Sequence, residues 1–280
     1  MLKTLTINAI TQYIDDNLES TSIDINTLVD YSGYSRRYLQ LLFKNNIGIS
    51  VGKYIQLRRI TRAAILLRFT SLNIVDISER LFYDSQQTFT REFKKNSGYT
   101  PLQYRKNKIW FFKNMTGHRE VDSNFPAPDI RFLERKEFNG HKILFKEAIP
   151  VINPLAKEKW DAVDYLLSNT NNPVFISHKI EDKKDNDNIH LNAVLWGGEG
   201  GNITSEELEE GYYACFKFKG TRDGYRKFTY YIYMNILPFY GLQKKDSYDL
   251  EVITKIDNDM CYYEYYLPIK NEEDNITETG

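Results

Sequence analysis

The sequence predicts two domains: an all-α domain with two helix-turn-helix units joined by a long helix, and an α+β domain with an antiparallel sheet and two helices. Three observations lead to this prediction. An apolar helical frame repeats after about 50 residues, strand-like runs replace it beyond residue 128, and the two parts carry opposite net charge. We expect domains at residues 1–110 and 128–270, a linker at 111–127 and a polar tail at 271–280.

The first half reads as successive helices separated by capping residues. A first helix ends near Glu19, and a short second helix ends at Gly33, which suits a left-handed C-terminal cap. Ser35 then caps a third helix, which completes a helix-turn-helix. Residues 51–69 contain no proline and form a long helical pattern of roughly 27 Å.

The strongest single observation is that this pattern occurs twice. Ser35 corresponds to Ser85, and Gly48 corresponds to Gly98. The other matched pairs are Leu39 with Phe89, Phe43 with Phe93, Lys44 with Lys94, Ser50 with Thr100 and Tyr54 with Tyr104. The apolar frame is kept while the polar residues differ, as expected for two copies of one scaffold that read two different sequences.

The net charge of −1 hides a strong asymmetry. Residues 1–119 contain 18 Lys and Arg against 9 Asp and Glu, which leaves 19 against 29 in residues 120–280. A basic half beside an acidic half indicates a polyanion-binding module, although charge alone does not separate DNA, RNA and anionic membrane. No apolar run approaches the roughly 18 residues of a membrane span and no signal peptide is evident, so we expect a cytoplasmic protein without membrane partners.

The helix opened by Ser85 has two chemically different faces. Phe89 and Phe93 form an apolar stripe. The residues that lie away from this stripe are Gln86, Gln87, Thr88 and Arg91. Gln can pair with adenine, Arg with guanine or phosphate, and Thr with a thymine methyl group, so this face can read base edges. The alternative is the solvated face of an ordinary amphipathic helix.

The long helix carries Arg58, Arg59, Arg62 and Arg68. These arginines are candidates for phosphate contacts, with solvated helix charges as the alternative. When the widths of the flanking helices are added to its length, the long helix can hold the two reading helices about 34 Å apart. This distance is one turn of duplex DNA. One chain could therefore occupy two successive major grooves.

The first half resembles the AraC/XylS transcription activators, in particular the Rob/MarA/SoxS subgroup. The resemblance covers residues 5–107 and is carried by Gly33-Tyr34-Ser35, Leu39-Gln40, Phe43, the long helix, Asp84-Ser85-Gln86-Gln87-Thr88-Phe89-Thr90-Arg91, Pro101 and Tyr104-Arg105. It implies monomeric binding to a degenerate element of double-stranded promoter DNA, with the helices at Ser35 and Ser85 each in a major groove. RNA polymerase is an expected partner.

By position, the resemblance implies DNA contacts from residues on both reading helices. The first helix supplies Arg37, Gln40 and Leu41, with Arg36 beside them, and the second supplies Gln86, Gln87, Thr88 and Arg91. The subgroup usually carries a tryptophan where this chain has Arg37 and an arginine where it has Leu41. Because Leu41 cannot hydrogen-bond a base, we expect an altered preference at the first half-element.

The acidic half changes to short strand-like runs interrupted by two helices. The expected strands are 130–133, 140–148, 173–180, 189–196, 212–219, 248–256 and 260–269, and the expected helices are 156–167 and 225–237. The order of strands and helix repeats once, which indicates a domain built as two similar halves.

Two stretches of this half resemble the GyrI-like effector domains: residues 208–220, and Glu264-Tyr265-Tyr266-Leu267-Pro268-Ile269-Lys270. The resemblance covers about residues 128–270 and implies a cleft that binds amphipathic or cationic molecules, with the carboxylate of the last strand at its centre. Strand alternation places Glu264 on one face with Tyr262 and Tyr266, an arrangement suited to a cation. Trp196 is equally suited to lining the pocket and to core packing.

These observations predict a DNA-binding transcription activator, not an enzyme, that senses an amphipathic or cationic compound in a stress or multidrug response. The alternative is a second domain that is a small-molecule hydrolase or a protein-interaction module. The effector could act through the domain junction or through availability to polymerase. We expect no cofactor and no metal, because the four histidines show no ligand spacing and suit the surface or strand ends. Cys215 and Cys261 suit buried reduced thiols.

Overall fold

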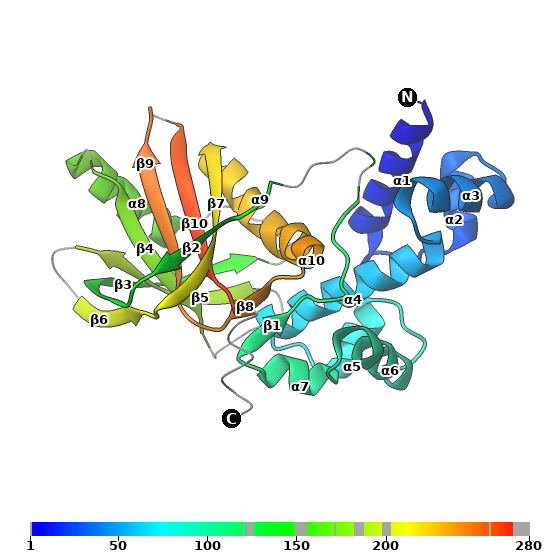
Figure 1. Ribbon diagram of the computed structural model, residues 1–280, viewed down its shortest axis with the longest axis horizontal. Coiled ribbons are helices and arrows are strands. Elements are labelled where there is room, and N and C mark those ends of the chain that lie inside the picture. The colour runs from blue at the N-terminus through cyan, green and yellow to red at the C-terminus, as the bar shows by residue number, and fades with distance from the viewer. Residues whose placement is uncertain are drawn as a thin grey trace.

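The computed structural model describes residues 2–119, 121, 126–148, 156–170, 172–181, 188–197, 203–257 and 259–270. The expected polar tail, 271–280, lies outside the described residues. A helical domain and a sheet domain lie side by side, and the long helix α4 runs from the first helical unit toward the sheet domain (Figure 1). None of the described helices is long and apolar enough to cross a membrane.

The helical domain contains the two predicted helix-turn-helix units. Its helices are α1 (Leu2–Asn17), α2 (Ile25–Ser32), α3 (Arg36–Ile47), α4 (Val51–Phe69), α5 (Ile74–Arg80), α6 (Gln86–Ser97) and α7 (Pro101–Lys106). Ser35 and Ser85 cap α3 and α6 by accepting a backbone hydrogen bond three residues on. Gly48 and Gly98 end the same helices in the left-handed conformation. The two units therefore share the same helix caps as well as the same pattern of apolar residues.

The two helical units differ in how they join the rest of the molecule. Leu39, Phe43 and Tyr54 belong to a separate apolar cluster built from α1 to the start of α4. Phe89 and Phe93 of the second unit instead belong to a cluster that continues into the sheet domain. The second unit and the sheet domain therefore share one core, whereas the first unit has its own.

Within the described residues, the sheet domain contains an eight-stranded antiparallel sheet in the order β2-β7-β10-β9-β4-β5-β3-β6. The strands are β2 (Asp129–Leu133), β3 (Lys136–Ala148), β4 (Val174–Ile180), β5 (Asn188–Trp196), β6 (Ile203–Leu208), β7 (Gly211–Gly220), β9 (Asp249–Lys255) and β10 (Cys261–Pro268). The units β3-α8-β4-β5 and β7-α9-β9-β10 form the two halves, and β4 pairs with β9 where they meet. The prediction of two similar halves agrees with this topology.

Helices α8 (Lys157–Asn169) and α9 (Arg222–Tyr231) cover the same face of the sheet. Trp160 of α8 and Tyr225 of α9 both contact the ring of Tyr263 on β10. The opposite face carries a second apolar cluster, which includes Phe138 and Tyr266. Both faces are therefore largely apolar, and side-chain alternation along a strand does not reveal which of them faces the helices.

Several details were not predicted. The expected helix 225–237 begins earlier, as α9, and continues as a π-helix (Ile232–Ile236) and α10 (Leu237–Tyr240). Two short strands, β1 (Ile109–Phe111) and β8 (Gln243–Lys245), pair across the domains. Strand β6 was missed because its sequence, Ile-Thr-Ser-Glu-Glu-Leu, lacks the alternation of a half-buried strand, and it lies at the edge of the sheet.

Candidate functional site

Helix α3 presents a polar face to solvent. Leu39, Leu42 and Phe43 are buried against the first unit. The exposed residues of the opposite face are Arg36, Arg37, Gln40, Leu41 and Lys44. Leu41 is an apolar side chain among these polar ones, and it is 57% exposed. This face can therefore offer cations, an amide and a methyl-bearing surface to a partner.

Helix α6 presents a similar face. Phe89 and Phe93 are fully buried, whereas Gln86, Gln87 and Arg91 are exposed. Thr88 is half-buried, and its hydroxyl accepts a hydrogen bond from Ser85 at 3.1 Å. The structure therefore exposes three of the four residues expected on this helix and holds the fourth against the helix cap.

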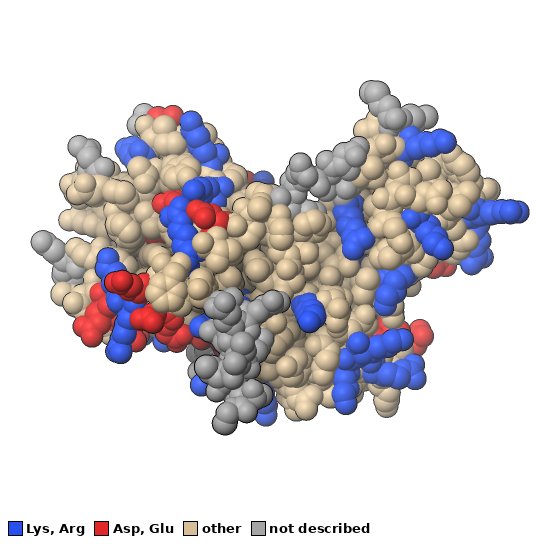
Figure 2. All heavy atoms as spheres, viewed as in Figure 1, with Lys and Arg blue, Asp and Glu red and all other residues tan. Residues whose placement is uncertain are grey.

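A hollow of about 750 Å³ separates the two reading helices. Gln40 of α3, Thr88 of α6 and Arg59 of α4 are among its lining residues. Figure 2 shows mainly Lys and Arg on the visible face of the helical domain, whereas the sheet domain carries Asp and Glu together with Lys and Arg. The excess of positive charge therefore lies on the helical domain.

The arginines of α4 correct one expectation. Arg58, Arg62 and Arg68 are at most 3% exposed, so they are neither solvated charges nor available to phosphates. Arg59 alone among the four lines the hollow between the readers. The three buried arginines bind groups inside the protein instead.

Arg58 joins three parts of the chain. Its guanidinium donates to both carboxylate oxygens of Asp15 in α1, at 2.7 and 3.1 Å. It also donates to the carbonyl of Thr116 at 2.8 Å and to that of Met234 in the π-helix at 3.1 Å. His118 contacts the same Asp15 at 2.6 Å, so the segment after β1 is packed into this junction.

Arg62 makes a second connection. It pairs with Glu19 after α1 and hydrogen-bonds the hydroxyl of Tyr230 on α9. Glu19 also pairs with Arg80 at the end of α5. One polar network thus joins both helix-turn-helix units to the sheet domain.

The sheet domain contains a cavity of about 90 Å³ between the sheet and its helices. Its aromatic lining includes Phe69, Phe145, Trp160, Tyr225, Tyr230 and Tyr233. Phe69 belongs to α4, so the helical domain contributes to the wall of the cavity. Phe69 packs against Trp110 and Tyr233, each with ring centroids 5.2 Å away.

Glu251 on β9 is one of the buried carboxylates that line this cavity. It accepts hydrogen bonds from Lys159 at 2.7 and 3.0 Å, and its Oε1 lies 2.9 Å from Nε2 of His178. Burial alone would raise the pKa of Glu251, but the attraction of Lys159 and the bond from His178 lower this pKa to about 2. Burial raises the pKa of the nearby Glu147, against the attraction of Lys159 and Arg226.

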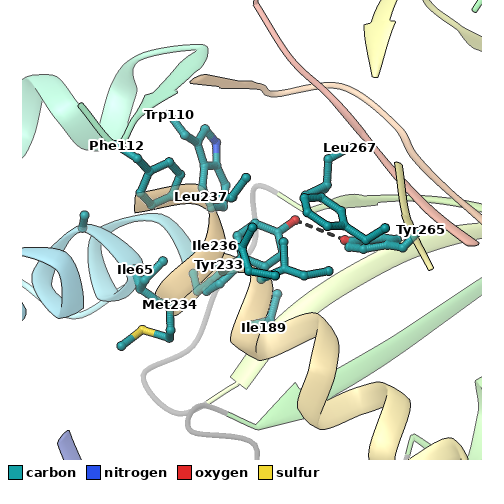
Figure 3. Close-up of a cluster of buried hydrophobic side chains, with 14 of the residues drawn as sticks. Ile65, Trp110, Phe112, Ile189, Tyr233, Met234, Ile236, Leu237, Tyr265 and Leu267 are labelled. Carbon is teal, nitrogen blue, oxygen red and sulfur yellow. Dashed lines mark hydrogen bonds between the residues drawn. The ribbon is translucent and has the colours of Figure 1, made fainter. Parts of the chain in front are cut away.

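Hydroxyl groups extend the network to the domain junction. Tyr233 and Tyr265 both donate to Asp249, at 3.0 and 2.8 Å. The oxygens of the two tyrosines lie 3.2 Å apart, as the dashed line in Figure 3 marks. Lys244 pairs with the other carboxylate oxygen of Asp249 at 2.8 Å, and its Nζ lies 5.4 Å from the ring centroid of Trp110. Figure 3 shows that these tyrosines lie beside apolar residues of both domains.

The residues expected to bind a ligand do not line this cavity. Glu264, Tyr262 and Tyr266 alternate with Tyr263 and Tyr265, so they point to the opposite face of β10. Glu264 is half-buried, with Arg131 3.7 Å away.

Trp196 also lies on the face of the sheet away from the helices. Its ring stacks between Phe138 and Phe175, and its Nε1 donates to Ser177 at 3.0 Å. Trp196 thus packs against two aromatic rings on that face and does not line the cavity between the sheet and its helices.

The sequence also contains a signal for the buried position of Glu251. Asp249 and Glu251 alternate with Leu250 and Val252 in a strand pattern, which places two acids together on one face. Acids on a strand are costly to bury unless they are paired, so they mark a specialised site. The histidines were expected at the surface or at strand ends, but His178 is buried beside this carboxylate and His118 is buried beside Asp15.

Two helices with exposed polar faces on a duplicated helix-turn-helix scaffold define a DNA-binding transcription regulator, and the second domain adds a cavity between its sheet and helices. Residues 28–107 match the family described as a helix-turn-helix domain. Residues 146–270 match the family described as a GyrI-like small molecule binding domain. The chain belongs to the AraC-type regulators that carry a GyrI-like small-molecule-binding domain, and these regulators are not enzymes.

Three relatives illustrate the membership. The chain is 43% identical over 271 residues to the F1 operon positive regulatory protein of Yersinia pestis, which covers 96% of this chain and 89% of the relative. It is 28% identical over 242 residues to the right origin-binding protein of Escherichia coli (82% and 83% covered). It is 40% identical over 101 residues to the multiple antibiotic resistance protein MarA of Salmonella typhimurium (36% and 79% covered). The predicted family and fold class are confirmed.

Proposed function

We propose that this protein is a transcription activator that binds promoter DNA as a single chain and responds to a small amphipathic molecule in the cavity of its sheet domain. The observation that carries the proposal is the position of Phe69. It ends the helix that joins the two DNA-reading units, and it also lines the cavity. A ligand in the cavity would therefore touch the DNA-binding domain itself, which favours an allosteric effect over mere availability to polymerase.

The proposed DNA contacts come from the exposed faces of α3 and α6. Helix α3 contributes Arg36, Arg37, Gln40 and Leu41, and helix α6 contributes Gln86, Gln87, Thr88 and Arg91. Each helix would occupy one major groove of the DNA. The hollow between the helices would then lie over the sugar-phosphate backbone that separates the two grooves. Because one chain carries both readers, no dimer is required.

The names of the relatives support the remaining parts of the proposal. One is called a positive regulatory protein and another a multiple antibiotic resistance protein. We therefore propose an activator that acts with RNA polymerase in a stress or multidrug response. We further propose domain limits at residues 1–110 and 128–270, although residues 115–118 are buried and pack between the domains.

The cavity suits an amphipathic or cationic effector. Aromatic rings supply apolar contact area, and Glu251 supplies a charge. The indole Nε1 of Trp160 is buried and has no hydrogen-bond partner among the described residues, so a polar group of the effector could accept from it.

Binding-site selection from random duplexes tests the DNA part of the proposal. We expect a bipartite site with half-elements about one helical turn apart and one chain per duplex. A symmetric site that binds two chains would contradict monomeric binding.

Calorimetry with benzyltrimethylammonium tests the ligand part. We expect the full chain to bind this cation, and Glu251→Gln to abolish the binding. Glu264→Gln makes the same change on the other face of the sheet and is the matched control. Loss of binding in Glu264→Gln alone would place the site on that other face.

A further inference from the structure

Lys159 already occupies the position that a cationic ligand would take. Its Nζ donates to both oxygens of Glu251, at 2.7 and 3.0 Å. The same Nζ lies 5.2 Å from the ring centroid of Trp160 and 5.5 Å from that of Phe145. A carboxylate flanked by aromatic rings is the arrangement that binds organic ammonium groups.

This arrangement leaves little free volume for a ligand in the present conformation. Lys159 is 7% exposed, and the remaining cavity of about 90 Å³ is well below the roughly 300 to 1,000 Å³ of ordinary ligand pockets. Arg226 and Glu147 also line the cavity, with a Glu147 oxygen 3.9 Å from the guanidinium of Arg226. The ammonium group of Lys159 thus already balances the negative charge of Glu251, the carboxylate that would attract a cation.

We propose that Lys159 is a built-in occupant of the effector site, and that an organic cation acts by displacing its ammonium group from Glu251. This inference rests on the proposed function, because it requires that the cavity be the effector site. Lys159 is the third residue of α8 and reaches Glu251 through a flexible four-carbon chain. Rotation about the bonds of this side chain can therefore move its ammonium group away from Glu251.

An effector must compete with the ammonium group of Lys159, and this requirement determines which class of cation can bind. A small, strongly hydrated amine gains nothing over the tethered ammonium group of Lys159, which forms the same contacts without the entropy cost of association. A bulky, weakly hydrated cation with an aromatic body adds apolar contacts with the cavity wall. The site should therefore prefer quaternary or delocalised aromatic cations to simple alkylamines.

The test compares the full-length wild type with Lys159→Met, which keeps most of the apolar stem and removes the charge. Calorimetric titrations would use n-butylammonium, which resembles the lysine side chain, and benzyltrimethylammonium. We expect n-butylammonium to bind the variant and not the wild type, and benzyltrimethylammonium to bind the variant at least about tenfold more tightly. Lys227→Met removes an exposed lysine and should leave both affinities unchanged. Lys159→Gln, which can still donate to Glu251, serves if Lys159→Met does not fold.

Other outcomes would overturn the proposal. Equal or weaker binding of both cations to the lysine variants would show that Lys159 does not compete with them. Binding of propionate by the wild type and its loss in Lys159→Met would make this an anion site. Failure of the proposed function looks different, because cation binding would then survive Glu251→Gln in both the wild type and the Lys159→Met background.

Discussion

The ion pair of Glu251 should make folding stability depend on acid pH in a specific way. The pKa of Glu251 is about 2 in the folded chain against an ordinary value of 4.5. A lowered pKa stabilises the folded state above pH 4.5, and this stabilisation is lost as the pH falls toward 2. The difference of about 2.5 units corresponds to roughly 3 kcal/mol at neutral pH, and the side chain is too deeply buried for solvent screening to reduce this value much.

Comparison with Glu251→Gln isolates this contribution. Urea unfolding of the wild type and the variant at pH 7 and pH 3 gives the difference in unfolding free energy at each pH. We expect this difference to shrink by roughly 2 kcal/mol between pH 7 and pH 3, because most of the linkage is lost in that interval. A difference that stays constant over this range would refute the account of Glu251 as a charged partner of Lys159.

Three further predictions concern the DNA face and the junction. Replacing thymine by deoxyuracil in the first half-element should weaken binding of the wild type but not of Leu41→Ala, and equal losses in a duplex-binding assay would remove Leu41 from methyl-group recognition. Arg91→Ala should weaken duplex binding by about 1 to 3 kcal/mol. If Arg91 contacts a phosphate, the variant should also reduce the slope of log K against log salt concentration by about 1, and an unchanged affinity would exclude any DNA contact by Arg91. Gly117→Ala should destabilise the domain junction, because its Cβ would lie 2.5 Å from the carbonyl oxygen of Asn235, and an unchanged unfolding midpoint would contradict this packing.

The helical domain was predictable because its signals are local. Ser35 and Ser85 are N-cap residues and indicate where two helices begin, and Gly33 indicates where a helix ends. The long helix was expected at residues 51–69, and α4 has these bounds. Such features depend on neighbours within one or two turns, which a sequence pattern records directly.

The buried arginines were not predictable in this way. Arg58 donates to Met234, which lies 176 positions away in the chain. The pattern of α4 is that of an arginine-rich helix, and nothing local shows that a second domain covers it. Only the tertiary arrangement decides between a phosphate contact and an interdomain hydrogen bond.

We propose Glu251 as the ligand carboxylate, whereas the sequence pattern favours Glu264. Alternation correctly separates Glu264 from Tyr263 and Tyr265, but it does not tell which face α8 and α9 cover. Both faces of the sheet bury aromatic residues, so composition did not resolve the question. The topology does, because Trp160 and Tyr225 contact Tyr263 and place the helices over the face that carries Glu251.

The most direct test of the account measures the coupling between the cavity and DNA. The affinity of the full chain for a selected duplex would be measured by fluorescence anisotropy, without and with saturating benzyltrimethylammonium. We predict that the cation changes the duplex Kd by at least about fivefold, and that the duplex changes the Kd of the cation by the same factor. An unchanged duplex Kd while calorimetry shows the cation bound would contradict the claim that the cavity and the reading helices are linked through α4.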